Sequence, residues 1–203
     1  MARRLPTLAV LAAVVVACGS TATGPLLTRN PETYLLSIDQ LESPGFTVDA
    51  APAQQNVSEV AHGDAVVAQR LVHSGLNAAS TVSFGRTVDF PTSNGPVEII
   101  DTVERFASTD GASSSFAADI NARDAMHGEV ATSAGVLGDQ AHADTLVITA
   151  PDGVAAVQVT LEWRVANVVV VLIVRGRYGG TRLDDALLLA HRQTSTQLAV
   201  GAR

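Results

Sequence analysis

The sequence contains no lysine and a single cysteine, Cys18, among its 203 residues. One cysteine excludes an internal disulfide, so the folded part must be stabilised by an apolar core. The absence of lysine excludes the Ser-x-x-Lys catalytic motif and the lysine of a P-loop. Gly-x-Ser-x-Gly, Gly-x-Gly-x-x-Gly and His-x-x-x-His patterns are also absent. The common spaced catalytic motifs are therefore missing from this chain.

Charged residues are scarce as well, and acidic residues outnumber basic ones. Charged residues make up 16% of the chain against 47% hydrophobic residues, and the formal net charge is −7. Such a composition is incompatible with wholesale disorder. An acidic chain repels phosphate backbones and anionic headgroups, so we expect neither a nucleic-acid partner nor a membrane-binding protein surface. The apolar run 168–174 is far shorter than the roughly 20 residues that a membrane helix needs.

The first residues have the pattern of an export signal. Two arginines precede an apolar run over residues 5–17, which ends in the sequence VVACG at 15–19. This resembles the lipobox of bacterial lipoproteins. The resemblance implies cleavage before Cys18, an acyl lipid on its thiol, and anchoring to the cell membrane on the extracytoplasmic face. The alternatives are an ordinary secretory signal that contains a cysteine and a short uncleaved anchor.

The chain then divides into three parts: a signal peptide (1–17), a flexible tether rich in small and polar residues (18–29), and a single domain (30–203). Hydrophobic periodicity predicts helices at 30–43, 58–75, 108–128 and 181–198. It predicts strands at 46–50, 81–86, 98–106, 144–149, 155–164 and 168–174, with a further short strand at 129–133 left open. We expect a hairpin between 81–86 and 98–106, a meander over the last three strands, and a central position for 168–174. The predicted fold is α+β: an antiparallel sheet of five or six strands with amphipathic helices packed on one face.

Two segments carry a more distant resemblance. The sequences GDQA at 138–141 and WRVANVVV at 163–170, followed by an amphipathic helix, are similar to a group of actinobacterial-type envelope domains. That group includes small lipoproteins and the extracellular sensor domain of a mycobacterial serine/threonine kinase. The resemblance covers about half the chain, from residue 97 onward. It implies an antiparallel sheet with flanking helices and a cleft for an unidentified ligand, with no catalytic residue. The kinase sensor domain has disulfides that this chain cannot form.

The loop 135–140 and the neighbouring strands supply candidates for a pocket rim, because loops on a rigid sheet often bind ligands. The candidates are Gly138, Asp139, Gln140, His142, Trp163 and Arg164. Arg164 could contribute to an anion-binding patch. The alternatives are a plain connecting loop, a solvated arginine, and a tryptophan that belongs to the core.

His142 and Asp144 form the one pair with potential metal or proton chemistry. They lie two residues apart, so if that segment is a strand, both point to one face and could share a metal ion or a proton. A metal site usually needs three or four ligands. We therefore expect a solvated pair, no metal and no cofactor.

These observations predict a non-catalytic binding or sensor-like lipoprotein, attached to the membrane through Cys18, that binds a small amphipathic ligand or an envelope protein. One alternative is a hydrolase acting on envelope material, with a dispersed site such as Asp139, His142 and Asp144. The other is a structural or assembly lipoprotein. A sizeable apolar cavity would favour binding, a cleft with pKa-perturbed groups would favour catalysis, and a flat apolar patch would favour assembly.

Overall fold

The computed structural model describes residues 25–41, 43–125, 128–149 and 153–199. The predicted signal peptide and most of the predicted tether, including Cys18, lie outside these ranges. Within them, no helix is both long enough and apolar enough to cross a bilayer.

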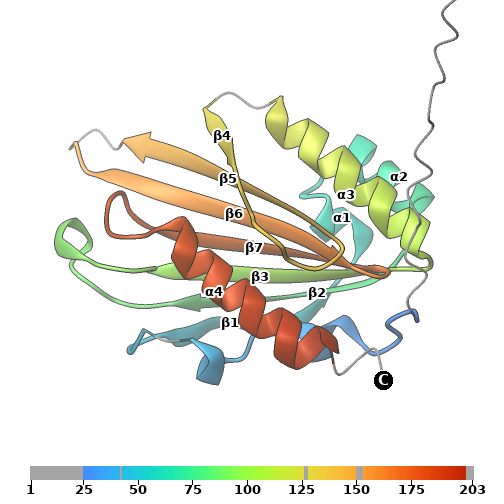
Figure 1. The fold of residues 1–203 in the computed structure, drawn as a ribbon, viewed down its shortest axis with the longest axis horizontal. Coiled ribbons are helices and arrows are strands. Elements are labelled where there is room, and N and C mark those ends of the chain that lie inside the picture. The colour runs from blue at the N-terminus through green and yellow to red at the C-terminus, as the bar shows by residue number, and fades with distance from the viewer. Residues whose placement is uncertain (1–24, 42, 126–127, 150–152, 200–203) are drawn as a thin grey trace, which may run out of the picture.

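A single antiparallel sheet of seven strands forms the framework of the domain (Figure 1). The strands are β1 (Thr47–Gln55), β2 (Leu76–Gly85), β3 (Glu98–Phe106), β4 (Glu129–Thr132), β5 (Gln140–Thr149), β6 (Ala155–Val165) and β7 (Val168–Arg177). Their order is β1-β2-β3-β7-β6-β5-β4. The expected hairpin, meander and central last strand are confirmed. The count of five or six was too low, because the edge strand β4, which the sequence left open, is only four residues long and has no buried side chain.

Helices cover both faces of the sheet, which corrects the prediction of one covered face. On the first face, α4 (Leu183–Gln193) and the π-helical turn η4 (Thr194–Leu198) pack over a core that contains Trp163 and Leu172. On the second face, α1 (Val57–Val60), α2 (Ala65–His73) and α3 (Thr109–Asp124) pack over Phe106 and Val169 of the sheet. In Figure 1, α4 crosses in front of the strands, whereas α1, α2 and α3 gather away from it. The central strand β7 requires this arrangement, because valines point from it to both faces.

Two predicted helices are divided in the structure. The segment 58–75 forms α1 and α2, separated at His62 and Gly63, which have φ values of 50° and 79°. Asp64 then begins a new helix by accepting hydrogen bonds from the amides of Val66 and Val67 at 2.8 and 3.1 Å. In place of the helix predicted at 30–43, the described residues 30–41 contain two short 3-10 turns, η1 (Pro31–Tyr34) and η2 (Ile38–Gln40). The third and fourth helices lie close to their predicted positions, and the remaining 3-10 turn is η3 (Phe90–Thr92).

The packed part of the chain begins before the predicted boundary at Asn30. Leu27 is only 1% exposed and belongs to the core of the first face. Its amide donates a hydrogen bond to Asn167 Oδ1 at 2.7 Å, and Asn167 Nδ2 donates to the carbonyls of Leu27 and Phe106 at 3.2 and 2.8 Å. A buried asparagine in the tight turn between β6 and β7 therefore holds the start of the domain in place.

Candidate functional site

An open groove lies on the second face of the sheet, beside α1, α2 and α3. It consists of two contiguous cavities of about 420 and about 380 Å³. Both cavities are lined by Val60, His62, Glu104, Val171 and Ile173. We call the two together the second-face groove. Each cavity falls in the size range of small-molecule binding sites.

The groove has apolar walls and a strongly charged interior. Val67, Leu71 and Ile100 add to its apolar surface. Its charged lining residues are Arg70, Glu104, Asp119, Arg123, Glu129, Glu162 and Arg175. This combination suits a ligand with an apolar body and a polar head.

Glu104 is the most perturbed acid of the groove. It lies on β3, is 7% exposed, and its Oε2 is buried without a hydrogen-bond partner among the described residues. Burial, together with the charges of Asp119 and Glu162, raises the pKa of Glu104 from 4.5 to about 8, although Arg70 and Arg123 oppose this. The carboxyl is therefore largely protonated at neutral pH and can donate a hydrogen bond.

Arg123 of α3 bridges two buried carboxylates on neighbouring strands. Its Nε donates to Asp144 Oδ2 of β5 at 3.0 Å, and its Nη2 pairs with Glu162 Oε2 of β6. The side chains of Asp144 and Glu162 are 3% and 0% exposed. Burial raises the pKa of Glu162 to about 7, even though Arg123 lowers it. A second arginine, Arg70 of α2, pairs with Asp119 of α3 and so joins the two helices above the groove.

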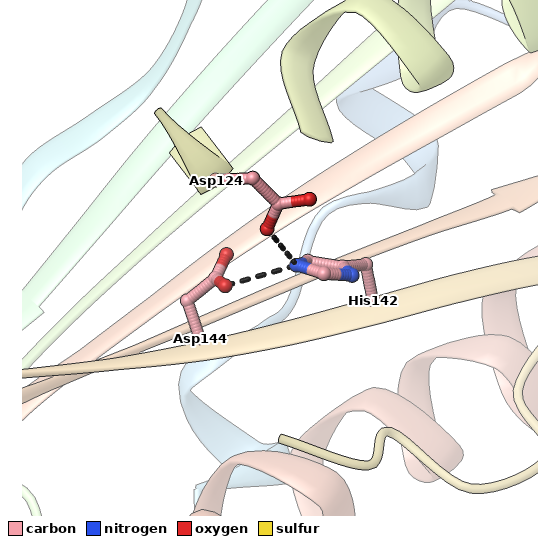
Figure 2. A group of neighbouring side chains, drawn as sticks. All are labelled: Asp124, His142 and Asp144. Atoms are coloured by element: carbon pink, nitrogen blue, oxygen red, sulfur yellow. Dashed lines mark hydrogen bonds and ion pairs between the residues drawn. The ribbon is translucent and has the colours of Figure 1, made fainter. Parts of the chain in front are cut away.

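A compact group of three titratable side chains lies where α3 ends beside β5 (Figure 2). His142 Nε2 lies 2.9 Å from Asp144 Oδ1 and 3.7 Å from Asp124 Oδ1. One donor atom from each residue lies within 4.8 Å of the other two. The pairing of His142 with Asp144 was predicted from the sequence, and the presence of Asp124 beside them was not. The available signal was the helical spacing of four that places Asp124 on the same side of α3 as Phe116 and Ile120.

The predicted rim residues of the loop form a hydrogen-bonded network instead. Asp139 Oδ2 accepts from the Ala166 amide at 2.7 Å and from Arg164 Nη1 at 3.1 Å. Gln140 Oε1 accepts from Arg164 Nε at 2.7 Å. Gly138 approaches so closely that a Cβ there would lie 2.3 Å from the Arg164 carbonyl oxygen. These contacts fasten the loop to the β6–β7 turn.

The two remaining rim candidates lie elsewhere. Trp163 is 0% exposed in the core of the first face, which agrees with the alternative that it is a core residue. His142 belongs to the group with Asp124 and Asp144. All six candidates are among the described residues, and none of them lines the second-face groove.

Comparisons with known proteins support the fold. No protein-family model matches the chain, and no curated protein matches it. The fold is similar to the crystal structure of the extracellular domain of PknH from Mycobacterium tuberculosis, with a TM-score of 0.51 and 13% sequence identity. The similarity covers 82% of this chain and 93% of that domain. At this identity the likeness shows a shared fold, and it agrees with the resemblance found in residues 138–141 and 163–170.

Proposed function

We propose that this protein is a non-catalytic, sensor-like lipoprotein that binds a small amphipathic ligand in the second-face groove, outside the cytoplasm. The observation that carries the proposal is a groove of ligand size that runs over the central strands and contains a buried carboxyl without a hydrogen-bond partner. The likeness to an extracellular domain and the export pattern of residues 1–19 support the location.

The groove suits a ligand whose head accepts a hydrogen bond. Glu104, protonated at neutral pH, has an unpartnered oxygen that can donate to such a head. Val171 and Ile173 line both cavities and would contact an apolar body. A buried polar group without a partner costs free energy, so a ligand that satisfies Glu104 gains affinity from it.

Filling the groove should abolish ligand retention. The substitution Ile173→Trp adds a bulky ring where both cavities meet, whereas Val66→Trp adds the same ring at a position of α2 that is 78% exposed and outside the groove. After incubation with envelope lipid extract, native mass spectrometry should show a bound small molecule on the wild type and on Val66→Trp, but not on Ile173→Trp. Equal retention by the two variants would place the ligand elsewhere, and a bare wild type would argue for a protein partner.

Acid–base catalysis is the second candidate function, because burial raises the pKa values of Glu104 and Glu162 toward neutrality within one groove. The mass of the retained molecule separates the two functions. A ligand recovered unchanged supports binding. A mass that changes with time, and stops changing in Glu104→Gln, would support an enzyme.

Membrane attachment should depend on Cys18. We expect Cys18→Ala to move the protein from the membrane fraction to a detergent-free supernatant, because two or more acyl chains are needed for stable anchoring and this change removes their attachment site. Cell fractionation followed by immunoblotting measures the effect. Wild-type membrane retention by Cys18→Ala would exclude a lipid anchor at this residue.

A further inference from the structure

The group Asp124, His142 and Asp144 has the donor spacing of a metal site. Ligand bonds to zinc are about 2.0–2.2 Å long, so two donors on one tetrahedral ion lie about 3.3–3.5 Å apart. The distances of 2.9 and 3.7 Å from His142 Nε2 to the two carboxylates bracket this value. Figure 2 shows both carboxylates directed toward the same imidazole nitrogen, with one aspartate from the end of α3 and the other two residues from β5.

Two neighbouring acids, each with an enclosed oxygen that lacks a hydrogen-bond partner among the described residues, support a cation there independently of this spacing. Glu129 of β4 lies on the same face as Asp144, and its Oε2 is enclosed without a hydrogen-bond partner in the described ranges. Burial raises the pKa of Glu129, and the charges of Asp144 and Asp124 add to this effect, while Arg123 and His142 oppose it. Across the strand pair, Glu162 faces His142 and has one buried oxygen without a partner. Arg123 supplies one positive charge to two carboxylates, Asp144 and Glu162.

A hydrogen bond from outside the group also orients Asp144. Arg123 holds Asp144 Oδ2, which leaves Oδ1 directed toward His142. Such outer-shell hydrogen bonds fix carboxylate ligands in known metal sites. Asp124, by contrast, is 51% exposed, so the site is open to an ion from solution.

We propose that Asp124, His142 and Asp144 bind one divalent transition-metal ion of the zinc type, with water in the fourth position. One imidazole and two carboxylates are ligands that such ions accept. The ion joins the last turn of α3 to β5. None of the three ligands lines the second-face groove, although Arg123, Glu129 and Glu162 beside them do. Zn²⁺ binding and retention of a small molecule are measured separately, so either proposal can fail without the other.

Isothermal titration of the metal-free mature chain with ZnCl₂ tests the site, in a protein carrying Cys18→Ser so that no thiol competes. We expect one Zn²⁺ per chain and a rise in Tm of about 5 °C or more at saturating metal. Asp124→Asn should weaken binding by about 100-fold or more, since even outer-shell changes weaken metal affinity by about 10–100-fold. The matched control is Asp184→Asn, an exposed acid of α4.

Asp124→Asn is the informative variant because the described contacts of its side chain are limited to His142, so its loss should leave the fold intact. The proposal is overturned if the wild type shows no saturable one-to-one binding, or if Asp124→Asn and His142→Ala bind Zn²⁺ as tightly as Asp184→Asn. It is also overturned if the NMR signals of the His142 ring are identical with and without saturating Zn²⁺.

Discussion

The domain is expected to lose several kcal/mol of stability as the pH rises from about 5 to about 9. Glu104 contributes most, because its pKa rises from 4.5 in a solvated carboxyl to about 8 in the fold. Below pH 4.5 the carboxyl is protonated whether the chain is folded or not, and the full stability is present. As the pH rises toward 8, unfolding increasingly releases a proton, so stability falls. At about 1.4 kcal/mol per pKa unit, Glu104 alone accounts for a loss on the order of 4 kcal/mol.

Two further buried acids act in the same direction. Burial raises the pKa values of Asp101, under η1 and α4, and of Glu162, beside Arg123, to about 7. Urea denaturation of the mature chain at several pH values measures the slope. Glu104→Gln should remove much of this slope and raise stability at pH 9, whereas Glu32→Gln, which changes an exposed acid in η1, should leave the slope unchanged. Equal slopes in the two variants would show that Glu104 is solvated.

Arg123→Ala is expected to destabilise the domain by about 3–5 kcal/mol at pH 8, the usual cost of removing one partner from a buried ion pair. The substitution leaves the carboxylates of Asp144 and Glu162 buried together without their shared cation. The loss should shrink at pH 5, where Glu162 takes up a proton. The free energy of unfolding at the two pH values measures both effects.

Arg175→Ala is the matched control. Arg175 pairs with Glu98 at 2.9 Å, but the two side chains are 41% and 39% exposed. An exposed pair contributes about 1 kcal/mol or less. A similar cost for both arginine variants would contradict a buried charge cluster under α3.

The parts of the sheet that join neighbours in the chain were readable from the sequence, whereas the pairing of β3 with β7 was not. The β2–β3 hairpin and the β5–β6–β7 meander join neighbours in the chain, and turn residues mark their ends. The face of the sheet that each helix covers was harder to predict. Apolar residues at every position of 168–174 already required cover on both faces, yet each helix by itself shows only that it has an apolar side. Which face of the sheet that side covers depends on how the connecting segments cross the sheet, and hydrophobic periodicity does not reveal this.

The groove was missed for a related reason. Glu104, Glu162, Arg70 and Arg123 come from β3, β6, α2 and α3, and only the fold brings them together. A glutamate inside a valine-rich strand such as β6 was the available signal, since a charge there must be paired or protonated. The expectation that loops form binding sites pointed instead to residues 138–140, whose hydrogen bonds to Arg164 fasten a turn.

If Cys18 is lipidated, the burial of Leu27 against Asn167 sets the length of the segment that connects the lipid to the domain. Only nine peptide steps separate Cys18 from Leu27. A fully extended chain spans about 3.3–3.6 Å per residue, so this segment is about 30 Å long at most. It is fixed at the end of the sheet formed by the β6–β7 turn and Phe106. Ile100 and Arg175, which line the groove, lie toward the opposite ends of their strands. The β6–β7 turn would therefore lie within about 30 Å of the lipid, and this part of the groove would lie at the end of the sheet away from the point of attachment.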